Sequence, residues 1–412
     1  MADVRPFAAV RARPELAGRI CCPPYDVLSI QEARVLADAN PDSFVRVTRA
    51  EVDFAGELDP YCAQVYERAR SNFLLMIGNG LLIQDSRPCY YVYRLTMGER
   101  SQTGLAGLVG CGDYRDGVVR AHELTRTEKE DDRARHIEVV GAQTGPAFLV
   151  YRATPELDGV LAEVASSAAE TSFIDESGVR HEAWVIEDET VVGRVREITG
   201  RLQRLYIADG HHRTAAALRV SERMKSAGGS DGFLAVLFPH NQLEIMPYNR
   251  VLRDLNGQTP ARVVARLAEV MELIDRPQET QPGLHEVDLY LSGGWHRFRF
   301  RTLPDGGTDP LKNLDVVLLQ EQVLEPVFGI GDPRRDDRIG FVGGVRGVDE
   351  LVRLVNSGEY VCAFAMHPTR IDDMMAIADS GRLLPPKSTW FEPKLRDGLF
   401  THMFNLPDAA PR

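Results

Sequence analysis

The segment Asp209–Arg213 gathers four ionisable side chains around one glycine. An apolar run, 202–208, precedes it, and an alanine-rich run, 214–225, follows it, so we expect a strand, a tight turn and a helix. The unpaired N–H groups and the dipole at a helix start favour an anion, and Arg213 adds a planar guanidinium. The sequence therefore predicts a phosphate-binding turn.

Each side chain of this turn has an expected role. The residues predicted to contact the phosphates of a cofactor are Gly210, His211, His212, Arg213 and Thr214. Asp209 has the opposite sign, so we expect it to hold Mg²⁺ or to orient a histidine. A helix N-cap with incidental polar neighbours is the structural alternative.

A second group of reactive residues lies at 120–125, upstream of the turn. Glu123 is a candidate general base toward a hydroxyl if burial raises its pKa, and His122 beside it is a candidate base or metal ligand. A solvated helix face fits the same pattern. The nearby stretch Asp131–Arg133 is interpreted as a solvated turn.

Two rigid turns and one late loop could supply the substrate side of a site. Pro23–Asp26 and Asn40–Phe44 contain prolines at the ends of short elements, where functional side chains are often mounted, and their candidates are Tyr25, Asp26 and Ser43. The loop 385–394 contains prolines, cations and aromatic residues, and we expect Lys387 to reach an anionic group of a substrate.

The composition limits the kind of protein. The chain has 412 residues and a net charge of −12, which disfavours a nucleic-acid partner. No run approaches the roughly 18 apolar residues of a membrane span, and no signal peptide is apparent. Six cysteines without a C-x-x-C spacing favour reduced thiols, so we expect a cytoplasmic protein.

Strands and helices alternate along the chain, which predicts a mixed α/β fold. We expect strands at 16–22, 89–95, 102–110, 147–151, 202–208 and 233–238, and helices at 30–40, 61–76, 155–169 and 214–225. Ser29 is the expected N-cap of the first of these helices. We assign residues 1–255 to a catalytic α/β core and 256–412 to an accessory α+β region, whose loop 385–394 packs back toward the site.

Seven motifs occur in an order that resembles a widespread bacterial and archaeal family known only as a domain of unknown function. The motifs are Arg5-Pro6-Phe7, Pro23-Pro24-Tyr25-Asp26-Val27, Asn40-Pro41-Asp42-Ser43-Phe44, His122-Glu123-Leu124-Thr125, Ala208-Asp209-Gly210-His211-His212-Arg213, Pro247-Tyr248-Asn249-Arg250-Val251 and Lys387-Ser388-Thr389-Trp390-Phe391. This resemblance adds Arg250 to the candidate substrate-binding residues.

The Asp-Gly-His-His-Arg motif also resembles the phosphate-binding box of the ParB/sulfiredoxin superfamily, which includes free serine kinases. The resemblance implies a ParB/sulfiredoxin-like nucleotide-binding core with elaborations at both ends. It implies transfer of a phosphoryl group from ATP, ADP or pyrophosphate, with Mg²⁺, to a small hydroxylated metabolite, L-serine first. Glu123 or Asp26 would act on that hydroxyl. The alternatives are a nucleotide-gated binding protein and a metal-dependent phosphohydrolase.

Overall fold

The computed structural model describes residues 1–56, 58–225, 227–304 and 308–404, which form two compact units. Unit 1 comprises residues 1–243 together with the segment that starts at Pro393, and unit 2 comprises Glu244–Glu392. The sequence predicts one boundary at 255/256. The chain instead leaves unit 1 after Leu243 and returns to it at Pro393, so unit 2 is an insertion into unit 1.

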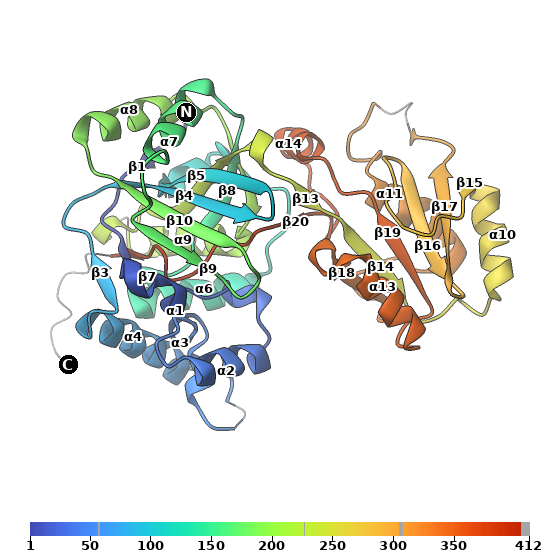
Figure 1. The fold of residues 1–412 in the computed structure, drawn as a ribbon, viewed down its shortest axis with the longest axis horizontal. Helices are drawn as coiled ribbons and strands as arrows, with labels where there is room; N and C mark the ends of the chain where they lie inside the picture. The colour runs from blue at the N-terminus through green and yellow to red at the C-terminus, as the bar shows by residue number, and fades with distance from the viewer. Residues whose placement is uncertain (57, 226, 305–307, 405–412) are drawn as a thin grey trace. The chain divides into compact units, whose positions relative to one another are not determined.

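Unit 1 is built on a nine-stranded mixed sheet with the order β6-β11-β8-β12-β5-β4-β10-β9, and β1 pairs with β5 (Figure 1). Its strands are β1 Val4–Arg5, β4 Tyr90–Met97, β5 Arg100–Gly110, β6 Val119–Arg120, β8 Ala147–Tyr151, β9 Thr171–Ile174, β10 Arg180–Ile186, β11 Leu205–Asp209 and β12 Gly232–Pro239. The strands β8 and β12 are parallel, and β11 is antiparallel to β8. The predicted α/β fold class is confirmed.

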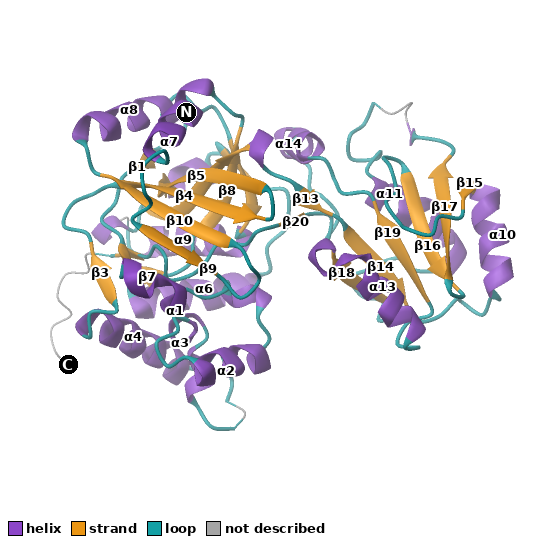
Figure 2. Ribbon diagram, viewed as in Figure 1, coloured by secondary structure: helices purple, strands orange, loops and turns teal. Residues whose placement is uncertain are grey.

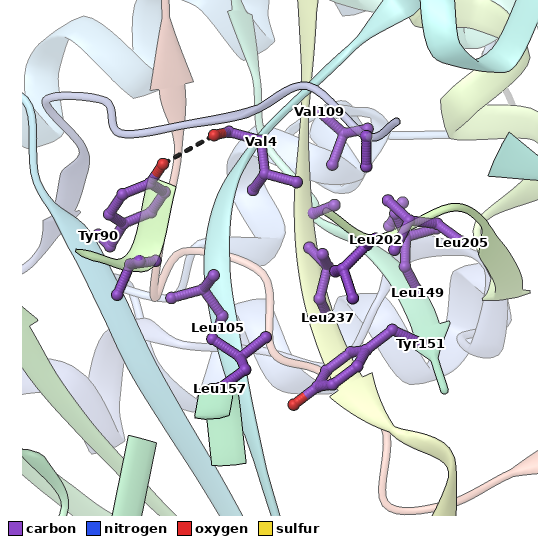
Figure 3. Close-up of a cluster of buried hydrophobic side chains, with 14 of the residues drawn as sticks. Val4, Tyr90, Leu105, Val109, Leu149, Tyr151, Leu157, Leu202, Leu205 and Leu237 are labelled. Atoms are coloured by element: carbon purple, nitrogen blue, oxygen red, sulfur yellow. Dashed lines mark hydrogen bonds between the residues drawn. The ribbon is translucent and has the colours of Figure 1, made fainter. Parts of the chain in front are cut away.

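Helices cover both faces of this sheet. As a consequence, central strands such as β8 are buried at every position. Figure 1 shows α7 (Pro155–Val164) and α8 (Glu189–Thr199) on one side and α6 (Thr127–Val140) and α9 (His211–Arg223) on the other. The core under α7 contains Leu149, Leu157, Leu205 and Leu237 (Figure 3). This packing holds β11 and the residues that follow it.

A layer of helices is formed by the N-terminal part of unit 1. It contains α1 Ala17–Ile20, α2 Ile30–Ala39, α3 Val45–Thr48 and α4 Ala63–Gly78. The predicted cap of α2 is confirmed, since Ser29 and Glu32 form a capping box. The strand predicted at 16–22 is wrong: a helical turn forms there, and its apolar residues Ala17 and Ile20 pack into a helical core instead of a sheet.

The returning segment after Pro393 is tied to unit 1 along its length. Single bridges join Asp397 to Cys22 and Thr401 to Val10. Further on, β21 (His402–Met403) pairs with β7 (Ala142–Gln143). These pairings join residues that are far apart in the chain, and they fix the positions of side chains between 394 and 402.

Unit 2 contains a six-stranded antiparallel sheet with the order β15-β17-β16-β19-β14-β18 (Figure 2). Its strands are β14 Tyr248–Leu252, β15 Met271–Asp275, β16 Glu286–Leu291, β17 Gly294–Phe300, β18 Ile339–Gly343 and β19 Cys362–Met366, and a separate pair joins β13 Ile245–Met246 to β20 Trp390–Phe391. Its helices are α10 Pro260–Val270, α11 Asp315–Leu319, α12 Glu325–Phe328, α13 Gly347–Asn356 and α14 Ile371–Asp379. In the described parts of the chain, no helix has the length and apolar character needed to cross a membrane.

Candidate functional site

The predicted strand–turn–helix arrangement is present at 205–223. Strand β11 ends at Asp209, Gly210 adopts φ 93° and ψ 26°, and α9 begins at His211. A side chain on Gly210 would be strained by this positive φ, and its Cβ would lie 3.2 Å from the Ala147 Cα atom. The N-cap residue Gly210 has no side chain to accept the first N–H groups of α9, and N–H groups at a helix start can bind an external acceptor.

Two cations meet the carboxylate of Asp209. The Arg213 Nη2 atom lies 2.5 Å from Oδ2, and the Lys394 Nζ atom lies 3.4 Å from Oδ1. Burial alone would raise the pKa of Asp209, but the charges of Lys394 and Arg213 hold it far below its usual range. Lys394 was not among the predicted site residues, because it lies in the returning segment.

Arg213 is the buried centre of the turn. It donates to the Pro146 carbonyl oxygen as well as to Asp209, and its Nη2 atom lies 3.7 Å from the Asp26 Oδ2 atom. Burial disfavours its charge, yet Asp26, Asp209 and Asp397 raise its pKa above the ordinary value. The guanidinium is therefore a fixed cation among carboxylates.

The two motifs that carry histidines in unit 1 come together at the start of α9. The rings of His122 and His211 pack edge to face with centroids 4.6 Å apart, and the Glu123 Oε2 atom lies 4.0 Å from the His211 Nδ1 atom. Burial lowers the pKa of His122 to about 4 and that of His211 well below its usual value, so both rings are neutral at pH 7. His122 is thus a buried residue, not part of a solvated face.

His212 and Thr214 are held by the backbone. The His212 Nε2 atom accepts the N–H of Arg126 at 3.0 Å, which ties α9 to the loop that carries Glu123. The Thr214 hydroxyl donates to the Gly210 carbonyl oxygen at 3.2 Å and is fully buried. Both residues stabilise the turn.

A small cavity of about 30 Å³ lies beside Arg213. Among the residues that line it are Tyr25, Arg133, Gly145 and Asp397. The Arg133 guanidinium lies over the Tyr25 ring at 4.0 Å from its centroid. Burial raises the pKa of Asp397 to about 7, although Arg213 opposes the shift. Neither Arg133 nor Asp397 was predicted for the site.

The solvated turn expected at 131–133 is wrong. These residues lie inside α6, and the Asp132 carboxylate is buried, where it accepts a hydrogen bond of 2.8 Å from the Tyr66 hydroxyl. The many charged residues of α6 make its buried face difficult to recognise in the sequence. The spacing of the apolar residues Ala134, Ile137 and Val140 indicates that face.

Three predicted substrate residues have partners within their own units. The Ser43 hydroxyl accepts the N–H of Val45 at 3.3 Å and supports the start of α3. Arg250 and Lys387 belong to unit 2, where Arg250 donates to the carbonyl oxygens of Tyr248 and Lys387. The Lys387 Nζ atom lies 5.3 Å from the centroid of the Tyr248 ring.

In the part of the chain that the structure describes, no group of three or more His, Cys, Asp or Glu side chains could hold a metal ion. The phosphohydrolase alternative, which uses His122, Glu123, His211 and His212 as ligands, receives no support from this geometry. A magnesium ion bound mainly through phosphates needs only one or two protein carboxylates, and Asp209 and Asp26 fit that requirement.

Residues 4–317 match the family described as "Protein of unknown function (DUF1015)", and the chain belongs to this family. This confirms the resemblance seen in the seven motifs. No curated protein sequence matches the chain.

Several solved structures resemble the chain weakly. SbnI from Staphylococcus aureus, with a C-terminal truncation, is 11% identical with a TM-score of 0.37, over 71% of this chain and 85% of that one. A free serine kinase in complex with AMP is 15% identical with a TM-score of 0.34, over 67% and 84%. A conserved hypothetical protein from Pyrococcus furiosus is 14% identical with a TM-score of 0.32, over 70% and 93%.

Proposed function

We propose that the protein is a small-molecule kinase that transfers a phosphoryl group from ATP, ADP or pyrophosphate to a hydroxyl, with free L-serine as the first acceptor to test. The observation that carries this proposal is the uncapped start of α9 behind Gly210, flanked by Arg213 and Lys394 and by the carboxylates of Asp26 and Glu123. Phosphoryl transfer requires this combination of anion binding and a carboxylate for the acceptor.

The donor side is the helix start. The first N–H groups of α9 bind phosphate oxygens, and Gly210 lets the backbone approach closely because it has no side chain. Arg213 and Lys394 supply positive charge without needing to move far, since Asp209 already orients both. The neutral rings of His122 and His211 shape this site but add no charge at pH 7.

The charge balance of the turn supports Mg²⁺ as a cofactor. Two cations, Arg213 and Lys394, face three carboxylates, those of Asp209, Asp26 and Glu123, so the turn does not attract a polyphosphate by net charge. A divalent ion that enters with the donor reverses this balance. Asp209 and Asp26 are the carboxylates that would hold it, and it would supply neutralisation of the migrating group.

Glu123 fits the general base better than Asp26. The Asp26 carboxylate faces the Arg213 guanidinium at 3.7 Å, so an acceptor hydroxyl would have to compete with this cation for it. Glu123 faces the His211 ring at 4.0 Å, and burial keeps that ring neutral. The Glu123 side chain is 47% exposed, so the burial on which the sequence prediction of this base depended is not present. The exposure instead leaves room for an acceptor to approach.

The test is a screen of donors against acceptors. Purified protein is incubated with Mg²⁺, L-serine or a related hydroxylated metabolite, and ATP, ADP or pyrophosphate in turn, and O-phospho-L-serine is measured by mass spectrometry. Asp209→Ala is the blank. For an active pair we expect Glu123→Gln to lower kcat by about 10²–10⁴-fold with little change in the KM of the donor.

Asp26→Asn is the matched control for Glu123→Gln, since it also neutralises one carboxylate near the turn. We expect its main effect on the KM of the donor, because it removes a partner of Arg213. Nucleotide binding without transfer to any acceptor would contradict the kinase and favour a nucleotide-gated binding protein. A larger loss of kcat in Asp26→Asn than in Glu123→Gln would indicate that Asp26, and not Glu123, is the general base.

A further inference from the structure

Unit 2 contains a polar cavity that the proposed kinase does not use. It measures about 200 Å³ and lies between the residues before β16, the start of α11 and the start of α14. Its lining includes His285, Asn313, Asp315, Arg370 and Asp373. A space of this size lined by so many charged and polar groups can hold a small polar molecule.

His285 and Asp315 form a fixed pair at this cavity. The Asp315 carboxylate is buried and accepts two hydrogen bonds from His285, one from the backbone N–H at 3.1 Å and one from Nδ1 at 2.9 Å. Because Nδ1 carries the proton of this bond, the lone pair of a neutral His285 ring lies on Nε2. His285 also adopts φ 62°, an uncommon conformation for a residue other than glycine.

The remaining charges of the cavity have opposite signs. Asp373 is half-buried and Arg370 is exposed, and both line the cavity. Asp373 lies three residues after Arg370, the N-cap of α14, and side chains at this spacing are neighbours at the start of a helix. No trio of metal-binding side chains is found here or elsewhere in the described ranges, which disfavours a bare cation as the ligand.

We propose that this cavity binds a small zwitterion of the amino-acid class. Arg370 pairs with the carboxylate of the ligand. The ammonium group of the ligand donates to the Asp373 carboxylate and to His285 Nε2, which Asp315 orients. One cation and several acceptors match a ligand that has one carboxylate and three N–H donors. This site is separate from the Gly210 turn, because it is formed by residues of unit 2 alone.

Titration calorimetry on the full-length protein tests this proposal. The probes are glycine, L-alanine and L-serine, with acetate and methylamine as the two halves of the ligand. We expect at least one amino acid to bind, and each half alone to bind at least about tenfold more weakly. Glycine is the most informative probe, because it has no hydroxyl that a kinase could phosphorylate.

Two variants locate the bound probe. Arg370→Gln changes an exposed residue, so it should fold normally and weaken binding by about 10- to 100-fold, and Asp373→Asn should weaken it by a similar factor. Arg335→Gln, which removes a cation at a side chain of unit 2 that is 87% exposed, is the matched control and should leave the affinity unchanged. The absence of binding by all three amino acids would overturn the proposal, as would equal affinity in Arg370→Gln and Asp373→Asn. The result with glycine is independent of the kinase activity, because glycine has no hydroxyl that could be phosphorylated.

Discussion

Arg213 in unit 1 and Arg250 in unit 2 are both buried, but they are stabilised in different ways. Arg213 is surrounded by carboxylates, and Asp26, Asp209 and Asp397 raise its pKa in spite of burial. Arg250 donates to two carbonyl oxygens and lies over the Phe341 ring, and burial lowers its pKa to about 10.

The comparison shows what each arginine contributes. Removal of Arg213 leaves the partly exposed carboxylates of Asp209 and Asp26 without their shared cation, whereas removal of Arg250, which is held by carbonyl oxygens, leaves no charge without compensation. A phosphate group of a ligand can therefore replace one of the carboxylates as the partner of Arg213. Arg250 is an element of structure that links Tyr248 to the loop at Lys387.

The largest expected effect is that of Arg213→Met. This change keeps much of the side-chain volume but leaves Asp209 and Asp26 without their guanidinium, so we expect a loss of about 3–5 kcal/mol in the free energy of unfolding. Urea denaturation at pH 7 measures it. Nucleotide binding should be lost as well. A stable variant that binds nucleotide as well as the parent would show that the carboxylates do not depend on Arg213.

The second effect concerns Asp397, whose pKa burial raises from 3.8 to about 7. The folded state then keeps a proton that the unfolded state releases, so this group makes stability fall as the pH rises from about 4 to 7. Asp397→Asn removes this contribution. We therefore expect the free energy of unfolding of the variant, relative to that of the parent, to rise by about 2–4 kcal/mol from pH 4 to pH 8.

Urea denaturation of the parent and of Asp397→Asn at each pH isolates this effect. The difference between the two proteins cancels the histidines, whose lowered pKa values act in the opposite direction: burial lowers the pKa of His136 to about 4, for example. A difference that does not change with pH would show that Asp397 is ionised throughout.

A smaller effect is expected from Arg250→Met, the counterpart of the first variant. The loss of hydrogen bonds to Tyr248 and Lys387 is offset by the relief of burying a charge, so we expect a loss of about 1–2 kcal/mol. Thermal and urea unfolding measure it, and kinase activity is the second readout. An effect as large as that of Arg213→Met would remove the distinction between the two arginines.

The smallest effect is that of Ser43→Ala. The Ser43 hydroxyl supports the start of α3 by accepting the N–H of Val45, so we expect a loss of about 0.5–1 kcal/mol and no change in the KM of any acceptor. Ser29→Ala, which removes the capping box of α2, is the matched control for stability. A higher acceptor KM in Ser43→Ala would restore the substrate role that the sequence predicted.

Local patterns predicted the elements that depend on local rules. The cap at Ser29, the buried strand β8 and the strand–glycine–helix turn at Gly210 follow from residue periodicity and from the conformational freedom of glycine. The helical turn at Ala17–Ile20 was missed because its short apolar run fits a strand equally well. Tertiary packing against the other helices decides between the two.

The parts of the site that the sequence did not predict depend on contacts between distant segments. Lys394 reaches Asp209, and Asp397 is positioned by its bridge to Cys22, yet neither pair leaves any periodic signal in the chain. Arg133 was hidden for a different reason. It lies in a helix with many charged residues, and its stacking on Tyr25 becomes visible only in three dimensions.

The return of the chain to unit 1 has a consequence for synthesis on the ribosome. Residues 1–243 emerge first, but Lys394 and the pairings of Asp397 and Thr401 follow only after the 244–392 insertion. At about 5–20 residues per second, the nascent chain waits roughly 7–30 s for these residues. During this interval Asp209 lacks one of its two cations, so the nascent protein completes its proposed phosphate site only after unit 2 has been translated.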